Sequence, residues 1–216
     1  FIEGTHHRII AEKLERIASG DLKRLIVNMP PRHSKSEFAS YLMPSWFLGR
    51  NPKLKIIQAT MNTELAVRFG RKVRDLIADP IYKEIFPNTD LKPDSQAAGR
   101  WETSAGGEYF AAGVGAAMTG RGADLLIIDD PHSEQDALSP SAYDNAWEWY
   151  TYGPRQRLQP GGTIIIVQTR WSKKDLTGRL LGAQARDIMA DQWEVIEFPA
   201  ILPSGEPLWH EFWKKE

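Results

Sequence analysis

The stretch "LIVNMPPRHSKSEFAS" (residues 25–40) has the strongest bearing on the fold. An apolar run and two prolines lead to Lys35 and Ser36, after which helix-favouring residues resume. Phosphate-binding loops follow the pattern G-x-x-x-x-G-K-[ST] between a strand and a helix. With Lys35 and Ser36 in the last two positions, Met29 and Ser34 replace the two glycines. The context predicts a phosphate-binding loop, while the missing glycines leave open an ordinary strand–turn–helix with a solvated lysine.

The composition is that of an ordinary soluble globular protein. The chain has 216 residues, a hydrophobic fraction of 42% and a net charge of −1, which excludes a uniform basic coat for nucleic acid but not a local basic patch. It contains no cysteine, which rules out disulfides, cysteine-type zinc sites and thiol nucleophiles. No apolar run approaches the length of a membrane helix, so we expect no membrane contact.

Apolar runs that suit buried strands alternate along the chain with amphipathic helical segments. Strands are expected at 24–29, 55–60, 107–113, 124–130, 162–171 and 193–202. Helices are expected at 8–19, 36–49, 62–78 and 173–186, with a helical segment from 147 that breaks at Gly153 and Pro154. This alternation predicts an α/β fold with a mainly parallel central sheet flanked by helices.

A second motif, "LLIIDD" (125–130), ends an apolar strand in two carboxylates. In parallel sheets, ligands bind at the carboxyl ends of the strands. Asp129 is the candidate Mg²⁺ ligand together with Ser36, and Asp130 is the candidate group that orients and deprotonates an attacking water. Taken alone, the pair could be acids that cap a helix before Pro131. In order and context with the loop, it predicts a nucleotide site.

A third apolar strand, "IIIVQTRW" (164–171), ends in polar residues. The Thr169 hydroxyl can sense a γ-phosphate and pass its loss to the next helix. Simple strand termination is the alternative.

An arginine can stabilise the charge that develops during phosphoryl transfer. Arg121 is the first candidate because Gly120 and Gly122 flank it. Arg32, inside the loop, and Arg170, beside the third strand, are the other two candidates. Any one of them could instead be solvated or paired with a surface acid.

Four segments, in order, closely resemble the large subunit of tailed-bacteriophage terminases. They are "VNMPPRHSKSE", "GVGAAMTGRGADLLIIDDP", "TRW" followed by "DLTGRLL", and "WEVIEFPAIL" followed by "GEPLW". The resemblance implies a P-loop ATPase of the additional-strand (ASCE) type, with residues 1–216 as the N-terminal ATPase domain of the DNA-packaging motor. We expect a longer parent chain whose C-terminal nuclease domain, and hence nuclease activity, is absent here.

The resemblance also implies the ligands, the partners and the roles of individual residues. ATP and Mg²⁺ are the expected cofactors. Double-stranded DNA, the portal protein, the small terminase subunit and a homo-oligomeric ring on the procapsid are the expected partners, with a monomer in isolation and the host cell cytoplasm as the location. The catalytic candidates are Asp130, Arg121 and Thr169, the last within the family's coupling motif. The candidate nucleotide contacts are Arg32, His33, Ser34, Lys35, Ser36 and Glu37, with "THHR" (Thr5–Arg8) as the candidate adenine-contacting segment.

Two other functions remain open from the residues alone. One is a superfamily 2-like helicase or other nucleic-acid translocase, against which the lack of a recognisable second helicase-like domain counts. The other is a non-hydrolysing DNA-docking module that kept the fold and lost the loop glycines.

Overall fold

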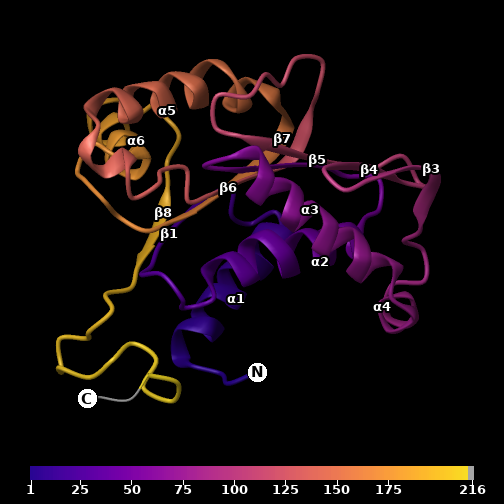
Figure 1. Ribbon diagram of the computed structural model, residues 1–216, viewed down its shortest axis with the longest axis horizontal. Coiled ribbons are helices and arrows are strands. Elements are labelled where there is room, and N and C mark those ends of the chain that lie inside the picture. The colour runs from indigo at the N-terminus through magenta and orange to yellow at the C-terminus, as the bar shows by residue number, and fades with distance from the viewer. Residues whose placement is uncertain (214–216) are drawn as a thin grey trace.

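The computed structural model describes residues 1–213 (Figure 1). Its strands are β1 (Arg24–Asn28), β2 (Lys55–Thr60), β3 (Leu91–Ala97), β4 (Arg100–Thr103), β5 (Glu108–Gly113), β6 (Ala123–Asp129), β7 (Leu158–Gln168) and β8 (Glu194–Glu197). Its helices are α1 (Thr5–Ser19), the π-helix η1 (Glu37–Leu42), α2 (Met43–Arg50), α3 (Thr63–Ala78), α4 (Pro80–Ile85), α5 (Pro140–Tyr152) and α6 (Leu176–Arg186), with short 3₁₀ turns η2 (Asp136–Leu138) and η3 (Pro154–Arg157).

The strands form one sheet in the order β3-β4-β5-β2-β6-β7-β1-β8. From β5 to β8 every pairing is parallel, whereas β4 and β3 extend the sheet as antiparallel neighbours of β5. The predicted α/β class with a mainly parallel sheet is therefore confirmed.

Helices cover both faces of the sheet, because the central strands are apolar on both sides (Figure 1). Along β1, Leu25 and Val27 belong to the core shared with α1, α2 and α3, while Ile26 between them belongs to the core on the other face. That second core contains Leu176 and Leu180 of α6.

The position of β7 defines the type of sheet. It lies between β1, which leads into the Lys35 loop, and β6, which ends in the acidic pair. Asn28 pairs with Gln168 and Asp129 with Val167, so all three strands end at one edge of the sheet. This inserted strand is the additional strand of the ASCE type.

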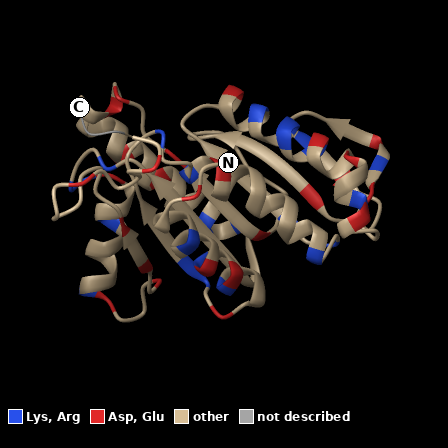
Figure 2. Cartoon of the chain, turned by 90° about the horizontal axis from the view of Figure 1, so that it is seen from below, with Lys and Arg blue, Asp and Glu red and all other residues tan. Residues whose placement is uncertain are grey.

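Charged residues are distributed over the elements rather than gathered on a single face. Figure 2 shows Lys and Arg interspersed with Asp and Glu along the chain, as the net charge of −1 leads one to expect. Within residues 1–213, none of the helices combines the length and apolar character needed to cross a bilayer.

The structure differs from the sequence-based expectations in several places, among them the following three. The β3–β4 extension was not expected, because the polar segment "LKPDSQA" forms a half-exposed edge strand that only its pairing defines. Helix α5 begins at Pro140, earlier than residue 147, with Ser139 as its cap. The expected final strand, 193–202, is regular only over Glu194–Glu197.

Candidate active site

The loop that follows β1 has a left-handed backbone at Ser34, the position where the phosphate-loop pattern has its second glycine. Ser34 has φ 72° and Arg32 has φ 60°, both in the left-handed region that is costly for residues with a Cβ atom. The loop is anchored to β7, since the Met29 N–H donates to the Gln168 carbonyl at 3.0 Å. Ser34 therefore occupies the position of the second glycine with glycine-like geometry.

The helix after the loop begins as the π-helix η1, which replaces the regular first turns that the sequence predicts. Single π-turns often occur at functional sites. The Phe38 N–H donates to the Ser34 carbonyl at 3.1 Å, which joins the helix directly to the loop.

Lys35 joins the three motifs. Its Nζ lies 2.9 Å from Asp130 Oδ2 and donates a hydrogen bond of 3.1 Å to Thr169 Oγ1. The lysine is 5% exposed. The structure therefore brings together the loop lysine, one acid of the pair and the strand-end threonine, which lie far apart in the sequence.

Asp129 is a buried carboxylate held by two hydroxyl groups. Ser36 Oγ donates to Oδ1 at 3.0 Å, and Ser40 Oγ donates to Oδ2 at 2.6 Å. Gln58 Nε2 in turn donates to Ser40 Oγ at 3.0 Å. The two residues predicted to bind a metal are thus in contact, and their oxygen atoms are of the kind that Mg²⁺ prefers.

Burial raises the pKa of Asp129 to about 7, and the nearby Asp130 carboxylate adds to this shift. The Ser40 and Ser36 hydrogen bonds and the Lys35 charge act in the opposite direction. A cation beside this carboxylate would favour its charged form. The chemistry of the donor set therefore fits Mg²⁺.

Asp130 differs from its neighbour in conformation and in exposure. Its φ is 43°, its side chain is 28% exposed, and Oδ1 accepts a hydrogen bond of 2.7 Å from the Thr169 N–H. It faces a cleft of about 680 Å³ that Pro31 and Thr169 also line. Each carboxylate oxygen thus has a partner, Thr169 for Oδ1 and Lys35 for Oδ2, while part of the side chain is open to the cleft.

The remaining predicted loop contacts have partners of different kinds. His33 Nδ1 lies 2.7 Å from the Pro31 carbonyl oxygen, within the loop. Glu37 accepts a hydrogen bond of 3.1 Å from Lys72 Nζ of α3. The structure places His33 on the loop and Glu37 on its helix, and within residues 1–213 no hydrogen bond or ion pair joins either of them to Lys35.

The three candidate arginines lie in different surroundings. Arg32 is exposed on the loop, and its side chain has no hydrogen bond or ion pair within residues 1–213. Arg170 Nε donates to Asp175 Oδ2 at 2.8 Å. Arg121 pairs with Glu108, and its Cζ lies 3.8 Å from the centroid of the Phe110 ring.

Arg121 lies at the edge of the sheet opposite the loop. It precedes β6, whose seven residues end at Asp129, a rise of roughly 20 Å at about 3.3 Å per residue. Arg121 is therefore far from Lys35 of its own chain, and action on a neighbouring subunit stays a prediction.

The "THHR" segment opens α1 and lies beside the loop. The ring centroids of His6 and His33 are 6.1 Å apart, and those of His6 and Trp209 are 5.5 Å apart. Burial, together with the charge that His7 can carry, lowers the pKa of His6 to about 4. A neutral ring beside the loop is compatible with an adenine contact, which stays a prediction.

The sequence analysis missed several polar residues of this site. Ser40 was detectable, because it lies four residues after Ser36 and such spacing places both on one helix face. Gln58 and Asn28 gave no such signal, because a single polar residue in an apolar strand does not reveal its neighbours.

No protein-family model matches the sequence, and no curated protein matches it. Solved structures do match. The large terminase of bacteriophage HK97 gives a TM-score of 0.51 at 13% identity, over 84% of this chain and 36% of that chain. An arginine-to-alanine mutant of the large terminase ATPase domain from Thermus phage P74-26 gives a TM-score of 0.52 at 14% identity, over 87% of this chain and 80% of that chain.

This chain has the fold of phage large-terminase ATPase domains, and the resemblance seen in the sequence is confirmed at that level. It spans 36% of the length of the HK97 protein.

We predict that Ser34→Gly is tolerated and stabilises the protein. Removing the Cβ atom relieves a left-handed strain of about 1–2 kcal/mol, and the extra chain entropy of glycine offsets about 0.5–1 kcal/mol of this. Urea unfolding should therefore show a small rise in the free energy of unfolding. Ser141→Gly, in a helical position of α5, is the control and should lower it. A loss of stability in Ser34→Gly equal to that of the control would contradict the role of φ.

We predict that Asp129 makes stability depend on pH when Mg²⁺ is absent. Because its folded pKa of about 7 lies above the ordinary aspartate value of 3.8, its contribution is complete below pH 3.8 and is lost as the pH rises through 7. Asp129→Asn carries no charge at any pH. In urea unfolding with a chelator, the variant should gain stability relative to the parent between about pH 5 and about pH 8. Parallel pH curves for the two proteins would show that the pKa is not raised.

Proposed function

We propose that this chain is a Mg²⁺-dependent ATPase that drives double-stranded DNA into a viral procapsid as the motor domain of a terminase large subunit. The observation that carries the proposal is the convergence of Lys35, Asp130 and Thr169 beside the buried Asp129–Ser36 pair. The fold shared with phage terminase ATPase domains supports it.

In this proposal, the loop N–H groups and Lys35 hold the β- and γ-phosphates of ATP. Ser36 and Asp129 would hold Mg²⁺, whose charge would offset the negative charge that develops on the phosphate oxygens. The incoming phosphates compete with Asp130 for Lys35, because both are anions and the lysine lies only 2.9 Å from the carboxylate. Nucleotide binding thereby frees Asp130 for the attacking water.

Hydrolysis then follows from the placement of Asp130. Its carboxylate accepts a proton as the water oxygen bonds to the γ-phosphorus, and the bond from that phosphorus to the bridging oxygen of ADP breaks. The Thr169 N–H holds Asp130 Oδ1 at 2.7 Å and so fixes the direction of the other oxygen. The products are ADP and inorganic phosphate.

The proposal extends to the setting in which the domain works. Its partners are double-stranded DNA, the portal protein and the small terminase subunit, and copies of the chain form a ring on the procapsid in the host cell cytoplasm. In isolation the domain is a monomer with slow turnover, since a neighbour completes the site. In this proposal, the chain contributes the ATPase domain of the motor.

We predict that Lys35→Ala lowers phosphate release from ATP by about 100-fold or more, because it removes the charge that meets the transferred phosphoryl group. A malachite-green assay with and without duplex DNA measures this. Lys72→Ala, which removes another lysine that contacts the loop helix, is the matched control and should keep its activity. Equal rates in Lys35→Ala and the parent would refute the loop assignment. A parent that releases no phosphate under either condition would favour the non-hydrolysing docking module.

We predict that Arg121 acts on the site of a neighbouring subunit. Arg121→Ala should bind nucleotide but lose turnover, and a mixture with Lys35→Ala should regain some phosphate release, since one interface then combines an intact loop with an intact arginine. Glu108→Gln breaks the same ion pair but keeps the guanidinium, so it controls for structural damage and should stay active. A mixture that stays inactive while parental subunits assemble would leave Arg121 with a structural role and favour Arg32.

A further inference from the structure

A basic groove lies between α5 and α6, apart from the nucleotide cleft. It encloses about 440 Å³, and its lining residues are Pro140, Asp144, Trp147, Lys173, Lys174, Gly178, Arg179, Gly182 and Arg186. Four of these residues are cations and one is an acid. The groove is therefore strongly positive in a chain whose net charge is −1.

Most of this charge is not neutralised by the chain itself. Arg179 pairs with Asp144. Lys173, Lys174 and Arg186 are exposed, and none has an ion pair within residues 1–213. Three uncompensated cations around one hollow raise the local concentration of anions.

The shape of the groove suits an extended polyanion. Gly182 has no side chain and lies on the part of α6 that lines the groove, where an added Cβ atom would meet no atom closer than 3.6 Å, so an approaching backbone meets little obstruction there. Arg179 and Arg186 are two turns apart on α6, a rise of about 10 Å, and duplex DNA presents a phosphate about every 3.4 Å along each strand. The cations therefore span several phosphates.

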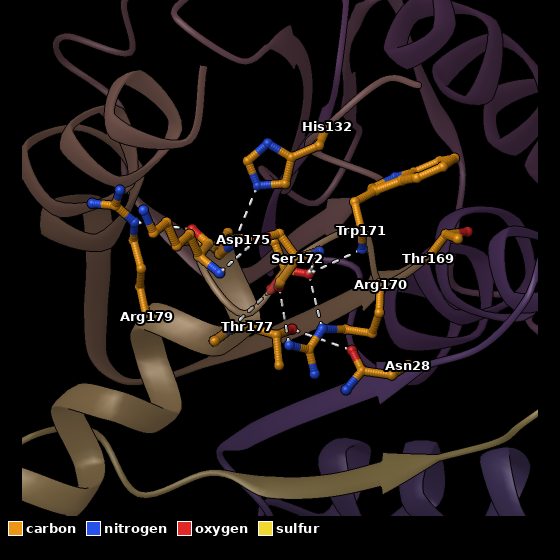
Figure 3. A network of polar contacts seen from close by, with 12 residues as sticks. Asn28, His132, Thr169, Arg170, Trp171, Ser172, Asp175, Thr177 and Arg179 are labelled. Atoms are coloured by element: carbon orange, nitrogen blue, oxygen red, sulfur yellow. Dashed lines mark hydrogen bonds and ion pairs between the residues drawn. The ribbon is translucent and has the colours of Figure 1, made fainter. Parts of the chain in front are cut away.

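The N-terminal end of α6 is anchored to the strand that carries Thr169. The fully buried Asp175 carboxylate accepts hydrogen bonds from Arg170 Nε at 2.8 Å and from the Gly178 N–H at 2.9 Å (Figure 3). It also accepts from the Trp171 N–H at 3.2 Å. Arg170 directly follows Thr169, the predicted γ-phosphate sensor. The Arg170–Asp175 contact therefore connects this sensor to the start of α6.

The same helix end is anchored to the other two strands of the site. The Leu176 N–H donates to His132 Nε2 at 3.1 Å, and His132 follows the acidic pair by two residues. Thr177 Oγ1 donates to Asn28 Oδ1 at 3.2 Å, and Asn28 is the last residue of β1 (Figure 3). All three strand ends that form the nucleotide site thus contact the start of the helix that lines the groove.

We propose that the α5–α6 groove binds the phosphate backbone of duplex DNA, without base specificity, and is a DNA-contacting surface of the motor. The DNA partner rests on the proposed function. The uncompensated cations and the attachment of α6 to the nucleotide site are independent of it. Phosphodiester contacts made by lysine and arginine carry no sequence information, which suits a surface along which DNA moves.

Fluorescence polarisation of a labelled duplex, measured over a range of salt concentrations, tests the groove. The double variant Lys173→Ala/Lys174→Ala should bind more weakly and reduce the slope of log K against log salt by about 2, one for each lost phosphate contact. The double variant Lys23→Ala/Lys53→Ala removes the same charge from two exposed lysines outside the groove and should keep the parental slope. Equal slopes in the two double variants, or no duplex binding by the parent, would overturn the proposal.

A second variant separates a shaped groove from general charge attraction. Gly182→Leu leaves the charge unchanged and places a bulky side chain where the nearest atom to an added Cβ is Arg186 Nη1 at 3.6 Å, so the helix can accommodate it. It should weaken duplex binding by blocking the groove. Parental affinity in this variant would show that the lysines attract DNA without a groove.

Two further measurements are needed. One distinguishes duplex DNA from free phosphate as the ligand of the groove, and the other distinguishes a failure of the groove proposal from a failure of the proposed function. Inorganic phosphate at equal phosphate concentration should compete far less than unlabelled duplex, and equal competition would identify a free-anion site and overturn the DNA assignment. A parent that binds duplex through the groove but releases no phosphate from ATP would refute the proposed function alone. A parent that hydrolyses ATP while the Lys173→Ala/Lys174→Ala slope stays parental would refute the groove alone.

Discussion

The parallel pairing of β6, β7 and β1 is the constraint on which the rest of the structure depends. Successive residues in a strand face opposite sides of the sheet, so a slip of one residue would exchange the positions of Asp129 and Asp130. In the observed register, Asp129 faces the loop helix and receives the Ser36 and Ser40 hydroxyls. The strand ends at Asp129, and the next residue, Asp130, turns through a positive φ toward Lys35 and the cleft. One register therefore assigns two adjacent carboxylates to different environments.

This arrangement lowers the stability of the folded protein. A sheet edge without a functional site would not need it. Ser34 and Asp130 occupy a left-handed conformation without being glycine, and Asp129 is a buried acid next to another acid. Strain and buried charge of this kind are characteristic of functional sites, where the surrounding structure holds them in place. Lys35 offsets part of the cost, since its charge lies between the loop and Asp130. A bound triphosphate and cation would replace that compensation with a stronger one.

The sequence was sufficient to predict the structural features that depend on the local residue pattern. It was not sufficient to predict those that depend on which strands pair with one another. Apolar runs that end in polar residues were sufficient to predict the central strands and to assign Lys35, Asp130 and Thr169, which the structure brings together, to one site. The β3–β4 extension was not predictable from the sequence, because its residues are mostly polar. These strands are defined by the pairing of β3 with β4 and of β4 with β5. Arg121 precedes β6 and therefore lies at the sheet edge opposite the Lys35 loop. The two glycines that flank Arg121 indicated that its loop could move, but they did not indicate at which edge of the sheet it lies. Asp175 was hidden because a helix-capping acid looks the same whether it is buried or exposed.

The network at the start of α6 suggests how the two ends of this helix can act together. Asp175 is fully buried and accepts several hydrogen bonds, so a shift of Arg170 must either carry the carboxylate along or leave a buried charge without a partner. The second outcome is expensive, so movement of the strand end is passed to the helix as a unit. Coupling between two binding sites is reciprocal. A polyanion that holds the far part of α6 would therefore bias the position of Thr169 and Arg170, and with it the affinity of the loop for nucleotide.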